Sequence, residues 1–443
     1  MTTNLLDKIS NYLPANEKFR ILYIQSKPVY VKSPINISKS VVNKPDTVKI
    51  RHFFTIISSS DIIVLGIEIF VYLQIYPDYI DQFIFVSKCD TVGFHKIEFK
   101  IGVIIEEFIQ YLINYDLTNY KIKPRKEKYD EQEKEDIPLV SNDRQTQTTY
   151  LLNELIKKLA SDPKYFSSIP YYQTNTVKST VPVKPNLLRQ LPSKQNIKVS
   201  LFTKAAPQYI FPNSAKNQHK HVINGQQLLK WWIPVINKCT SKWPIHRLMI
   251  PGSDKLSTSK FIQNFPNWSI GHIFGTKGPA VYSIALFPDD PKGRFLEHLI
   301  VENRYSNVNV EQFYEELGYR QEFRLGDLVG LIGCEIDDVP ISSNQQEKEN
   351  YSIQKLSIHQ YKQFINLIKS ENYNVEVDIK SLVETKIPSF FELNKLPFNY
   401  INVVGKMAKH AAQSRKQEPV VNTLTVKRKT NDLTGLVKRK KKS

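Results

Sequence analysis

Two adjacent carboxylates, Asp289 and Asp290, are the residues whose placement in this sequence most suggests chemistry. They stand in the segment LFPDDPKGRF, residues 286–295, where an apolar stretch meets an amphipathic one. An Asp directly before Pro291 is a good helix N-cap with Pro at the first helical position, but a cap uses only one acid. A carboxylate against an apolar wall can also accept a proton from an amine. Lys292 follows closely, so helix capping and proton chemistry both remain open.

Asp90 and a pair of tryptophans are the next candidates. Asp90 follows an apolar run in the segment FVSKCDT, where an Asx-turn is the simplest role for it. Trp231 and Trp232 lie on a predicted helix that begins at Asn224, with Gln227 completing a capping box. Adjacent helical residues point about 100° apart, so we expect one indole in the core and the other on a surface or groove. Core packing is the default role for Trp232.

Basic residues recur in loops that each adjoin a predicted strand end or helix start. Taken separately, each loop is a solvated face, whereas together they can hold a phosphate-rich ligand by charge and by backbone N–H groups. Two histidines in one loop, His219 and His221, have no acidic or cysteine neighbours, so we expect no metal site. The basic residues of these loops are His95, Lys96 and Lys100; Lys204; and Lys216, Lys220 and His221.

The composition is that of a globular protein with a basic excess. Of 443 residues, 41% are hydrophobic, and 61 Lys and Arg against 43 Asp and Glu give a net charge of +18, which favours polyanionic partners. The sequence contains no GxGxxG, GxxxxGKS/T, GxSxG or HExxH motif, which excludes several enzyme classes. Three separated cysteines argue against a disulfide framework. The start has no apolar leader and the most apolar run, residues 62–76, is too short to cross a bilayer, so we expect an intracellular protein that makes no membrane contact.

The strand and helix patterns along the chain predict an α+β fold. One large domain, residues 1–410, is expected to carry a charged and Pro-rich insert over residues 121–194 that is partly disordered. Strand signals on both sides of the insert are alike, so we predict no division into two domains. Expected strands cover residues 21–25, 29–31, 52–57, 62–76, 81–88, 197–202 and 280–287. Expected helices cover residues 102–115 and 150–159, begin at Asn224 and Pro291, and cover residues 311–319 and 358–368.

The last residues, 411–443, are predicted to form a basic tail. Residues 427–443 carry eight positive charges and one negative charge, so +7 of the net +18 is found there. Such a cluster is typical of a nuclear-import signal, or of a segment that makes weak and non-specific contacts with nucleic acid. A tail that only increases solubility remains an alternative.

Three segments together resemble the fungal histone H3 lysine acetyltransferases first described as regulators of Ty transposition. The resemblance extends over about residues 1–120 and 195–335. It implies a central mixed β-sheet surrounded by helices, similar to the fold of the metazoan CREB-binding-protein acetyltransferases. The segments are VSKCDTVGF (residues 86–94), LFTKAAPQYIFPNSAKNQHKHVINGQQLLKWW (residues 201–232) and LFPDDPKGRF (residues 286–295).

This resemblance implies transfer of acetyl from acetyl-CoA to lysines of histone H3. The principal target would be the lysine before the first long core helix, with tail lysines also used. It further implies a nuclear role in chromatin assembly and genome stability, with histone H3–H4 as substrate and two kinds of H3–H4 chaperone as partners, one of the NAP type and one of the anti-silencing type. The alternative function is a non-catalytic chromatin scaffold that binds histones, chaperones or DNA through its basic surface and tail.

The resemblance also implies roles for individual residues. Asp290 corresponds to a proton-accepting carboxylate with Asp289 beside it, Asp90 lies in the active-site loop, and Trp232 lies in the substrate groove. Lys292 corresponds to a buried lysine that the enzyme acetylates on itself. A carboxylate of ordinary pKa is a poor base for a lysine ammonium, so we expect orientation and desolvation to contribute at least as much as base catalysis. The positions implied to contact CoA are Cys89, Asp90, Thr91, Lys96, Ile97, Glu98, Phe99, Lys100, Phe202, Ala206, His221, Val222, Ile223 and Trp231.

Overall fold

The computed structural model of the chain describes residues 5–38, 41, 44–125, 188–275, 278–320, 327–341 and 353–407. Most of the expected insert, including the predicted helix over residues 150–159, lies outside the described residues, as does the predicted basic tail. The segments before and after the insert nevertheless lie in one sheet, because strand β5 (Tyr79–Thr91) pairs in parallel with strand β6 (Lys194–Thr203).

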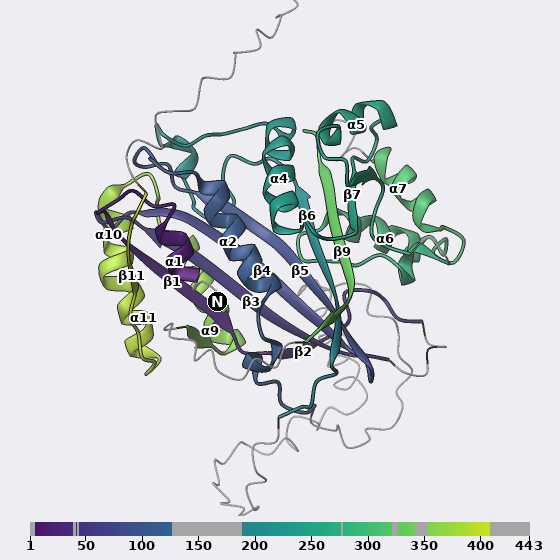
Figure 1. Cartoon of the computed structure of the whole chain (residues 1–443), viewed down its shortest axis with the longest axis horizontal. Helices are drawn as coiled ribbons and strands as arrows, with labels where there is room; N and C mark the ends of the chain where they lie inside the picture. Colours follow the sequence, from purple (N-terminus) through teal and green to yellow (C-terminus); the bar gives the residue numbers. More distant parts are fainter. Residues whose placement is uncertain are drawn as a thin grey trace, which may run out of the picture.

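A mixed β-sheet organises the described part of the chain (Figure 1). Its path runs β10-β1-β3-β4-β5-β6-β9-β7-β8, with β11 against β1 and β2 against β3. The neighbours β1, β3, β4 and β5 pair antiparallel, whereas β5 with β6, β1 with β10 and β7 with β8 are parallel. The predicted α+β fold with a central mixed sheet is therefore confirmed. The other strands are β1 (Lys18–Ser26), β2 (Val29–Val31), β3 (Asp46–Ile57), β4 (Ile63–Ile75), β7 (Ile245–Met249), β8 (Trp268–Ile270), β9 (Gly330–Pro340), β10 (Gln354–Leu356) and β11 (Ile401–Val404).

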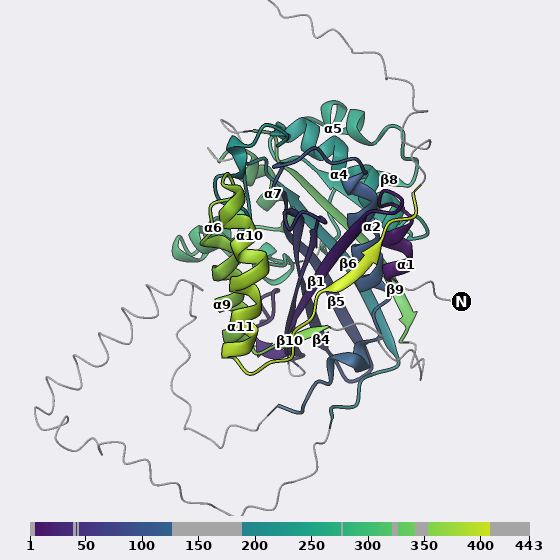
Figure 2. The same cartoon turned by 90° about the vertical axis from the view of Figure 1, so that its left-hand side faces the viewer.

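Helices cover both faces of the sheet (Figures 1 and 2). Helices α1, α2 and α4 pack on one face, and α9, α10 and α11 pack on the opposite face. In the described part of the chain, no helix is both long and apolar enough to cross a membrane. The helices are α1 (Leu5–Ser10), α2 (Ile101–Ile113), α4 (Gly225–Cys239), α5 (Lys255–Ile262), α6 (Pro291–Val301), α7 (Val310–Gly318), α9 (Ile358–Lys369), α10 (Glu376–Ser381) and α11 (Ile387–Leu393). Short 3-10 turns are η1 (Leu117–Tyr120), η3 (Ser214–Lys216) and η4 (Ala280–Tyr282), and the π-helical segment η5 (Leu382–Lys386) joins α10 to α11.

Strand β4 shows how one sequence serves both faces. Its odd-numbered residues from Leu65 to Ile75 are aliphatic and belong to the core cluster under α2 and α4. Phe70 and Tyr72 point to the opposite face, where they pack with rings from β5. A strand buried on both faces has a nearly continuous apolar sequence, which is the pattern that predicted a strand over residues 62–76.

The predicted strand over residues 280–287 is wrong. Ala280–Tyr282 form the 3-10 turn η4, and residues 283–287 continue without strand pairing. Val281 and Ile284 pack against α6 and α7, whereas Phe287 reaches the sheet. Both environments bury apolar side chains, and a short apolar run has no periodicity that separates a strand from a buried turn.

The buried imidazole of His52 is expected to make the fold sensitive to acid. His52 is fully buried between the hydroxyl groups of Tyr23 and Tyr120, at 2.7 and 3.1 Å. Burial lowers the pKa of His52 from 6.5 to about 3, so below pH 6.5 the unfolded chain binds a proton that the folded chain does not. Stability contributed by the neutral ring is complete above pH 6.5 and is lost as the pH falls. Between pH 6.5 and 5 the loss should be about 2 kcal/mol.

Urea unfolding at pH 7 and pH 5 tests this expectation with the wild type and His52→Gln. Gln retains polar atoms for both tyrosine hydroxyls but does not titrate, so the variant should lose about 2 kcal/mol less than the wild type between the two pH values. An equal pH dependence in both proteins would show that His52 does not govern acid sensitivity.

Candidate active site

A bulge in β5 decides which side of the sheet Asp90 faces. Before the bulge, Ile84 and Val86 point into the core under α2. The pairing with β4 then shifts register between Val86 and Lys88, which reverses the alternation. Lys88 and Asp90 therefore lie on the opposite face. The strand also continues to Thr91 rather than ending at Lys88 as predicted, so Asp90 belongs to a strand end and not to a loop.

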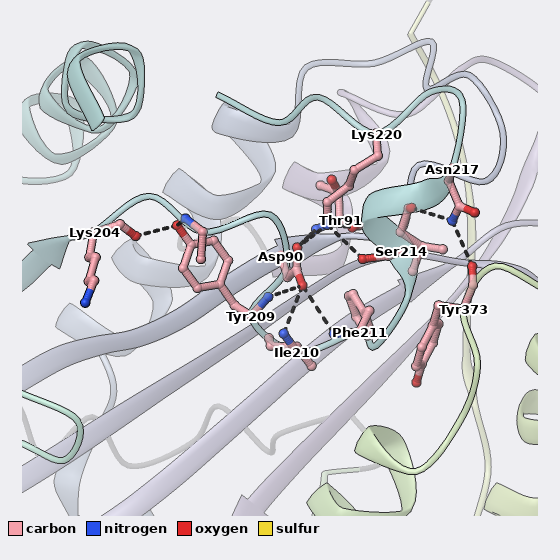
Figure 3. Close-up of polar contacts among 12 residues, drawn as sticks. Asp90, Thr91, Lys204, Tyr209, Ile210, Phe211, Ser214, Asn217, Lys220 and Tyr373 are labelled. Atoms are coloured by element: carbon pink, nitrogen blue, oxygen red, sulfur yellow. Dashed lines mark hydrogen bonds and ion pairs between the residues drawn. The ribbon is translucent and has the colours of Figure 1, made fainter. Parts of the chain in front are cut away.

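The carboxylate of Asp90 is a buried hydrogen-bond centre (Figure 3). Its Oδ1 accepts the backbone N–H of Thr91 and a hydrogen bond from the Lys220 ammonium. Its Oδ2 accepts three consecutive backbone N–H groups, those of Tyr209, Ile210 and Phe211, at 2.8, 2.9 and 3.2 Å. The loop after β6 is thus anchored to the end of β5 by one carboxylate.

Two neighbours make this anchor possible, and sequence analysis missed the role of both. The sequence pattern places Lys220 in a phosphate-holding loop, but its side chain is 4% exposed and also donates to the Thr91 carbonyl and to Ser214 Oγ. Gly66, the cross-strand neighbour of Asp90, leaves room for Phe211, because a Cβ there would lie 2.7 Å from the Phe211 ring. Both roles depend on contacts between residues far apart in the sequence, which form only when the chain folds.

Tyr209 closes the start of the same loop. Its hydroxyl donates to the Lys204 carbonyl at 2.5 Å and accepts the backbone N–H of Ala206 at 2.8 Å. Burial raises the pKa of Tyr209 to about 12, so the hydroxyl remains a donor. The Lys204 side chain itself is exposed. The loop that carries Ala206, one of the implied CoA positions, is therefore held by hydrogen bonds to Asp90 and by the Tyr209 hydroxyl.

Asp289 and Asp290 have different environments although they are adjacent. Asp290 caps α6 as predicted: its Oδ1 accepts the Lys292 backbone N–H at 3.0 Å, and its Oδ2 accepts the Lys292 ammonium at 2.5 Å. The side chains of Asp290 and Lys292 are only 1% and 6% exposed. Asp289 has a left-handed φ of 60° and is 73% exposed, with one oxygen 2.9 Å from Lys88 Nζ. Asp290 is therefore buried, with both of its oxygens bonded to Lys292, whereas Asp289 is accessible to solvent.

The structure brings the three acids to one end of one sheet face. Lys88, the partner of Asp289, precedes Asp90 by two residues on the same face of β5, a separation of about 7 Å along a strand. Phe287 fixes the segment before the acids on this face, because its ring stacks on Phe85 with centroids 4.4 Å apart. Asp289 and Asp90 therefore lie on the same sheet face, and Asp290 follows Asp289 directly in the chain.

Trp232 is placed differently from the acids. It is 4% exposed and belongs to the core cluster under α2 and α4, and its ring contacts Trp231 edge to face with centroids 4.9 Å apart. Trp231 is half-buried, so the prediction that only one indole is core is confirmed. Within the described residues, no hydrogen bond or ring contact joins Trp232 to the three acids, and no acceptor is placed for its indole N–H.

The remaining implied CoA positions lie on adjoining segments. The backbone N–H of His219 donates to the carbonyl of Gly93 at 3.2 Å, which joins residues 93–100 to residues 217–223. Gly93 has φ of 65°, and a Cβ there would lie 2.5 Å from the Lys220 backbone. Residues 93–99 line one side of a cavity of about 220 Å³. Lys96, Glu98, Lys100, His221 and Val222 are exposed, whereas Cys89, Thr91, Ile97, Phe99, Phe202, Ala206, Ile223 and Trp231 are partly buried.

The described residues give little support for a cysteine nucleophile or a metal ion at this site. Burial, and after it the Asp90 charge, raise the pKa of the Cys89 thiol above its ordinary range, so the thiol stays protonated and is a poor nucleophile. Across the parts of the chain that the structure describes, no three His, Cys, Asp or Glu side chains are grouped to hold a metal ion.

Known proteins are similar to this chain in fold and in sequence. The crystal structure of Rtt109 from Aspergillus fumigatus superposes with a TM-score of 0.63 at 21% identity and covers 92% of this chain and 100% of that one, which identifies the fold. A family model described as the histone acetyltransferase KAT11-type domain matches residues 5–389. The chain belongs to this family and is a histone acetyltransferase.

Individual relatives agree with that assignment. Histone acetyltransferase RTT109 of Candida albicans is 46% identical over 370 residues, which are 83% of this chain and 96% of that protein. Histone acetyltransferase rtt109 of Schizosaccharomyces pombe is 32% identical over 160 residues, which are 32% of this chain and 42% of that protein. As a histone acetyltransferase, the enzyme uses acetyl-CoA and acts on histones.

Proposed function

We propose that this enzyme transfers acetyl from acetyl-CoA to histone H3 lysines at the end of β5, where Asp90, Asp289 and Asp290 converge. The observation that carries this proposal is the separation of β5 from β6 beside the acids. The two strands pair in parallel from Tyr79 with Lys194 as far as Val86 with Leu201, but β5 continues to Thr91 and β6 to Thr203. Backbone beyond the last pair has no strand partner across this opening and can pair with the amides of a pantetheine arm.

The residues around this opening fit CoA. Cys89 and Thr91 line the β5 side, Phe202 and Ala206 the β6 side, and the exposed cations Lys96 and Lys100 supply charge for phosphates. Ile97, Glu98 and Phe99 form the rest of that segment, and His221, Val222, Ile223 and Trp231 extend the CoA-facing surface toward α4. We assign Trp232 a supporting role there, because its ring packs in the core beneath Trp231.

The chain's own residues would act by position more than by strong basicity. Acetyl-CoA, when bound, supplies the activated acyl group. A substrate lysine has a pKa of about 10.4 and must lose a proton before it can attack. Both oxygens of Asp290 are occupied by Lys292, so Asp290 orients the segment, whereas the exposed Asp289 can accept the incoming ammonium. This division supports orientation and desolvation as the main contributions.

Purified enzyme with labelled acetyl-CoA, histone H3–H4 and a histone chaperone tests this function. Saturable CoA binding and label on H3 are expected. The alternative of a non-catalytic scaffold that holds histones, chaperones or DNA predicts neither result. Mass spectrometry of the product would report whether the lysine before the first long core helix of H3 is preferred over tail lysines, and whether Lys292 becomes acetylated.

We also propose a nuclear location and partnership with a NAP-type and an anti-silencing H3–H4 chaperone, in chromatin assembly and genome stability. Support comes from the family and from the charged composition of residues 121–194 and the basic residues 411–443. Deletion of residues 126–187 should weaken stimulation by an acidic chaperone and leave basal turnover intact. Loss of basal turnover as well would make the segment part of the catalytic fold.

Gly93→Ala should weaken acetyl-CoA binding. The new Cβ would lie 2.5 Å from the Lys220 backbone at a φ of 65°, so the two proposed CoA-binding segments must separate. We expect KM for acetyl-CoA to rise about tenfold with kcat changed less than threefold. The matched control is Gly275→Ala, where the added Cβ meets nothing within 4 Å. An unchanged KM in Gly93→Ala would remove these segments from the CoA site.

A further inference from the structure

Two cations lie over aromatic rings on the sheet face that also carries Asp90. Strands β3 and β4 place Lys49 beside Tyr72, and Arg51 beside Phe70, as cross-strand neighbours. The Lys49 ammonium is 4.0 Å from the Phe70 ring centroid and 4.7 Å from that of Tyr72. The Arg51 guanidinium is 5.3 Å from the Phe70 centroid. We refer to these two cations as the Lys49–Arg51 patch.

The two cations of the patch are not paired with an acid in the part of the chain that the structure describes. Among the described residues, no carboxylate forms an ion pair with Lys49 or Arg51, and the buried Arg51 Nε has no hydrogen-bond acceptor. Lys49 is 7% exposed, and burial, followed by the charge of Arg51, lowers its pKa to about 7. An arriving carboxylate would supply both the missing charge and the missing acceptors.

The elements around the patch add further positive charge. The two nearby acids are already engaged: Glu68 accepts a hydrogen bond from Tyr361 at 3.0 Å, and Asp289 pairs with Lys88. Five basic side chains, including the patch itself, therefore lie near these two acids, and Asp90 and Asp290 at the end of the face are paired with Lys220 and Lys292. The cations beyond the patch are Lys88 of β5 and Lys362 and Lys369 of α9.

The patch lies a short peptide length from the acids. Lys88 and Glu68 form the cross-strand row next to Asp90, and the following row contains Phe70 and therefore Arg51. Rows are about 7 Å apart along a strand, and an extended peptide advances about 3.3 Å per residue. A substrate whose lysine reaches Asp289 thus places over the patch a side chain located roughly two to four residues away.

We propose that the Lys49–Arg51 patch binds the carboxylate of an Asp or Glu located roughly two to four residues from the acceptor lysine of the protein substrate. This inference rests on the acetyl-transfer site proposed above and adds a sequence preference to it. Substrate segments in which the only charges near the lysine are positive gain nothing from the patch.

Peptide pairs test the proposal on the unaltered enzyme. Each pair carries one acceptor lysine and either Glu or Gln at a single position, scanned from five residues before the lysine to five after it. We expect kcat/KM for Glu over Gln to reach at least fivefold at a position two to four residues from the lysine, on one side. Ratios near one throughout would overturn the proposal.

Binding measurements separate this inference from the acetyl-transfer proposal. Fluorescence anisotropy of the same peptides should show tighter binding of the Glu member even without turnover, so the preference is measurable on an inactive preparation as well. Equal affinity within each pair would overturn the inference while leaving acetyl transfer intact.

Variants assign the preference to the patch. Lys49→Met and Arg51→Gln should reduce the Glu-to-Gln ratio to near one while leaving kcat for the Gln peptide within about twofold. Lys18→Gln, an exposed cation at the start of β1, is the matched control and should keep the ratio. A ratio that survives in both patch variants would place acid recognition elsewhere.

Discussion

Asp90→Ala is expected to be the most damaging single substitution in the candidate active site. It removes the acceptor of three backbone N–H groups in residues 209–211 and leaves the Lys220 ammonium buried without its charge partner. Removing one member of a buried ion pair costs about 3–5 kcal/mol. The loop after β6 should detach from β5, and kcat/KM for acetyl transfer should fall by more than 100-fold.

Urea unfolding and steady-state acetyl transfer measure the two parts of this expectation. Asp254→Ala is the matched control, because Asp254 also accepts a backbone N–H, that of Ser257, but in an exposed helix cap whose loss costs about 1 kcal/mol. Lys220→Met should be less damaging than Asp90→Ala, because the carboxylate would keep its backbone donors. A loss of less than about 1 kcal/mol in stability and less than threefold in activity would show that the hydrogen bonds of Asp90 to residues 209–211 are not needed for function.

Asp290→Asn is expected to lower kcat by at least tenfold and to destabilise the protein by about 3–5 kcal/mol, because it leaves the buried Lys292 ammonium without its charge partner. Asn caps helices as well as Asp does, so the start of α6 should survive. The substitution removes the negative charge that holds the buried Lys292 ammonium, so the segment carrying Asp289 should lose its fixed position. Far-UV circular dichroism separates these effects, because only a collapse of α6 would lower the helical signal together with kcat.

A pH–rate profile distinguishes orientation from base catalysis at Asp290. If Asp290 orients, the Asn variant should keep the profile of the wild type at a lower plateau. Asp290→Ala, which removes the cap as well as the charge, should lower both kcat and the melting temperature. A chemical step within about threefold of the wild type in Asp290→Asn would exclude this residue from the mechanism.

Local features are predictable because they depend on neighbouring residues. The capping box of Asn224 with Gln227 forms as the spacing predicts, and Asp290 caps the helix that begins at Pro291. The same holds for the helix predicted over residues 102–115, which forms as α2 (Ile101–Ile113). Each of these depends on contacts within one or two helical turns.

Long-range features are not predictable from the same patterns. Polar residues at the end of the apolar run predict that β5 stops at Lys88, yet the bulge keeps the strand paired with β4 as far as Thr91. The apolar sequence of residues 280–287 is compatible with either a buried strand or a buried turn. Packing against α6 and α7 selects the turn. Lys220 has the sequence surroundings of a surface cation, but the folded loop buries it against Asp90.

The sequence by itself determined the class of fold, the helix caps and the acids able to do chemistry, because each depends on residue type and short spacing. Only the tertiary structure decided that Asp90 and Asp289 share a sheet face, that Asp290 is occupied by Lys292, and that Trp232 lies in the core under α2 and α4. The physical reason is that a one-residue register shift in β5 reverses every later side chain, and that shift is set by pairing with a neighbouring strand.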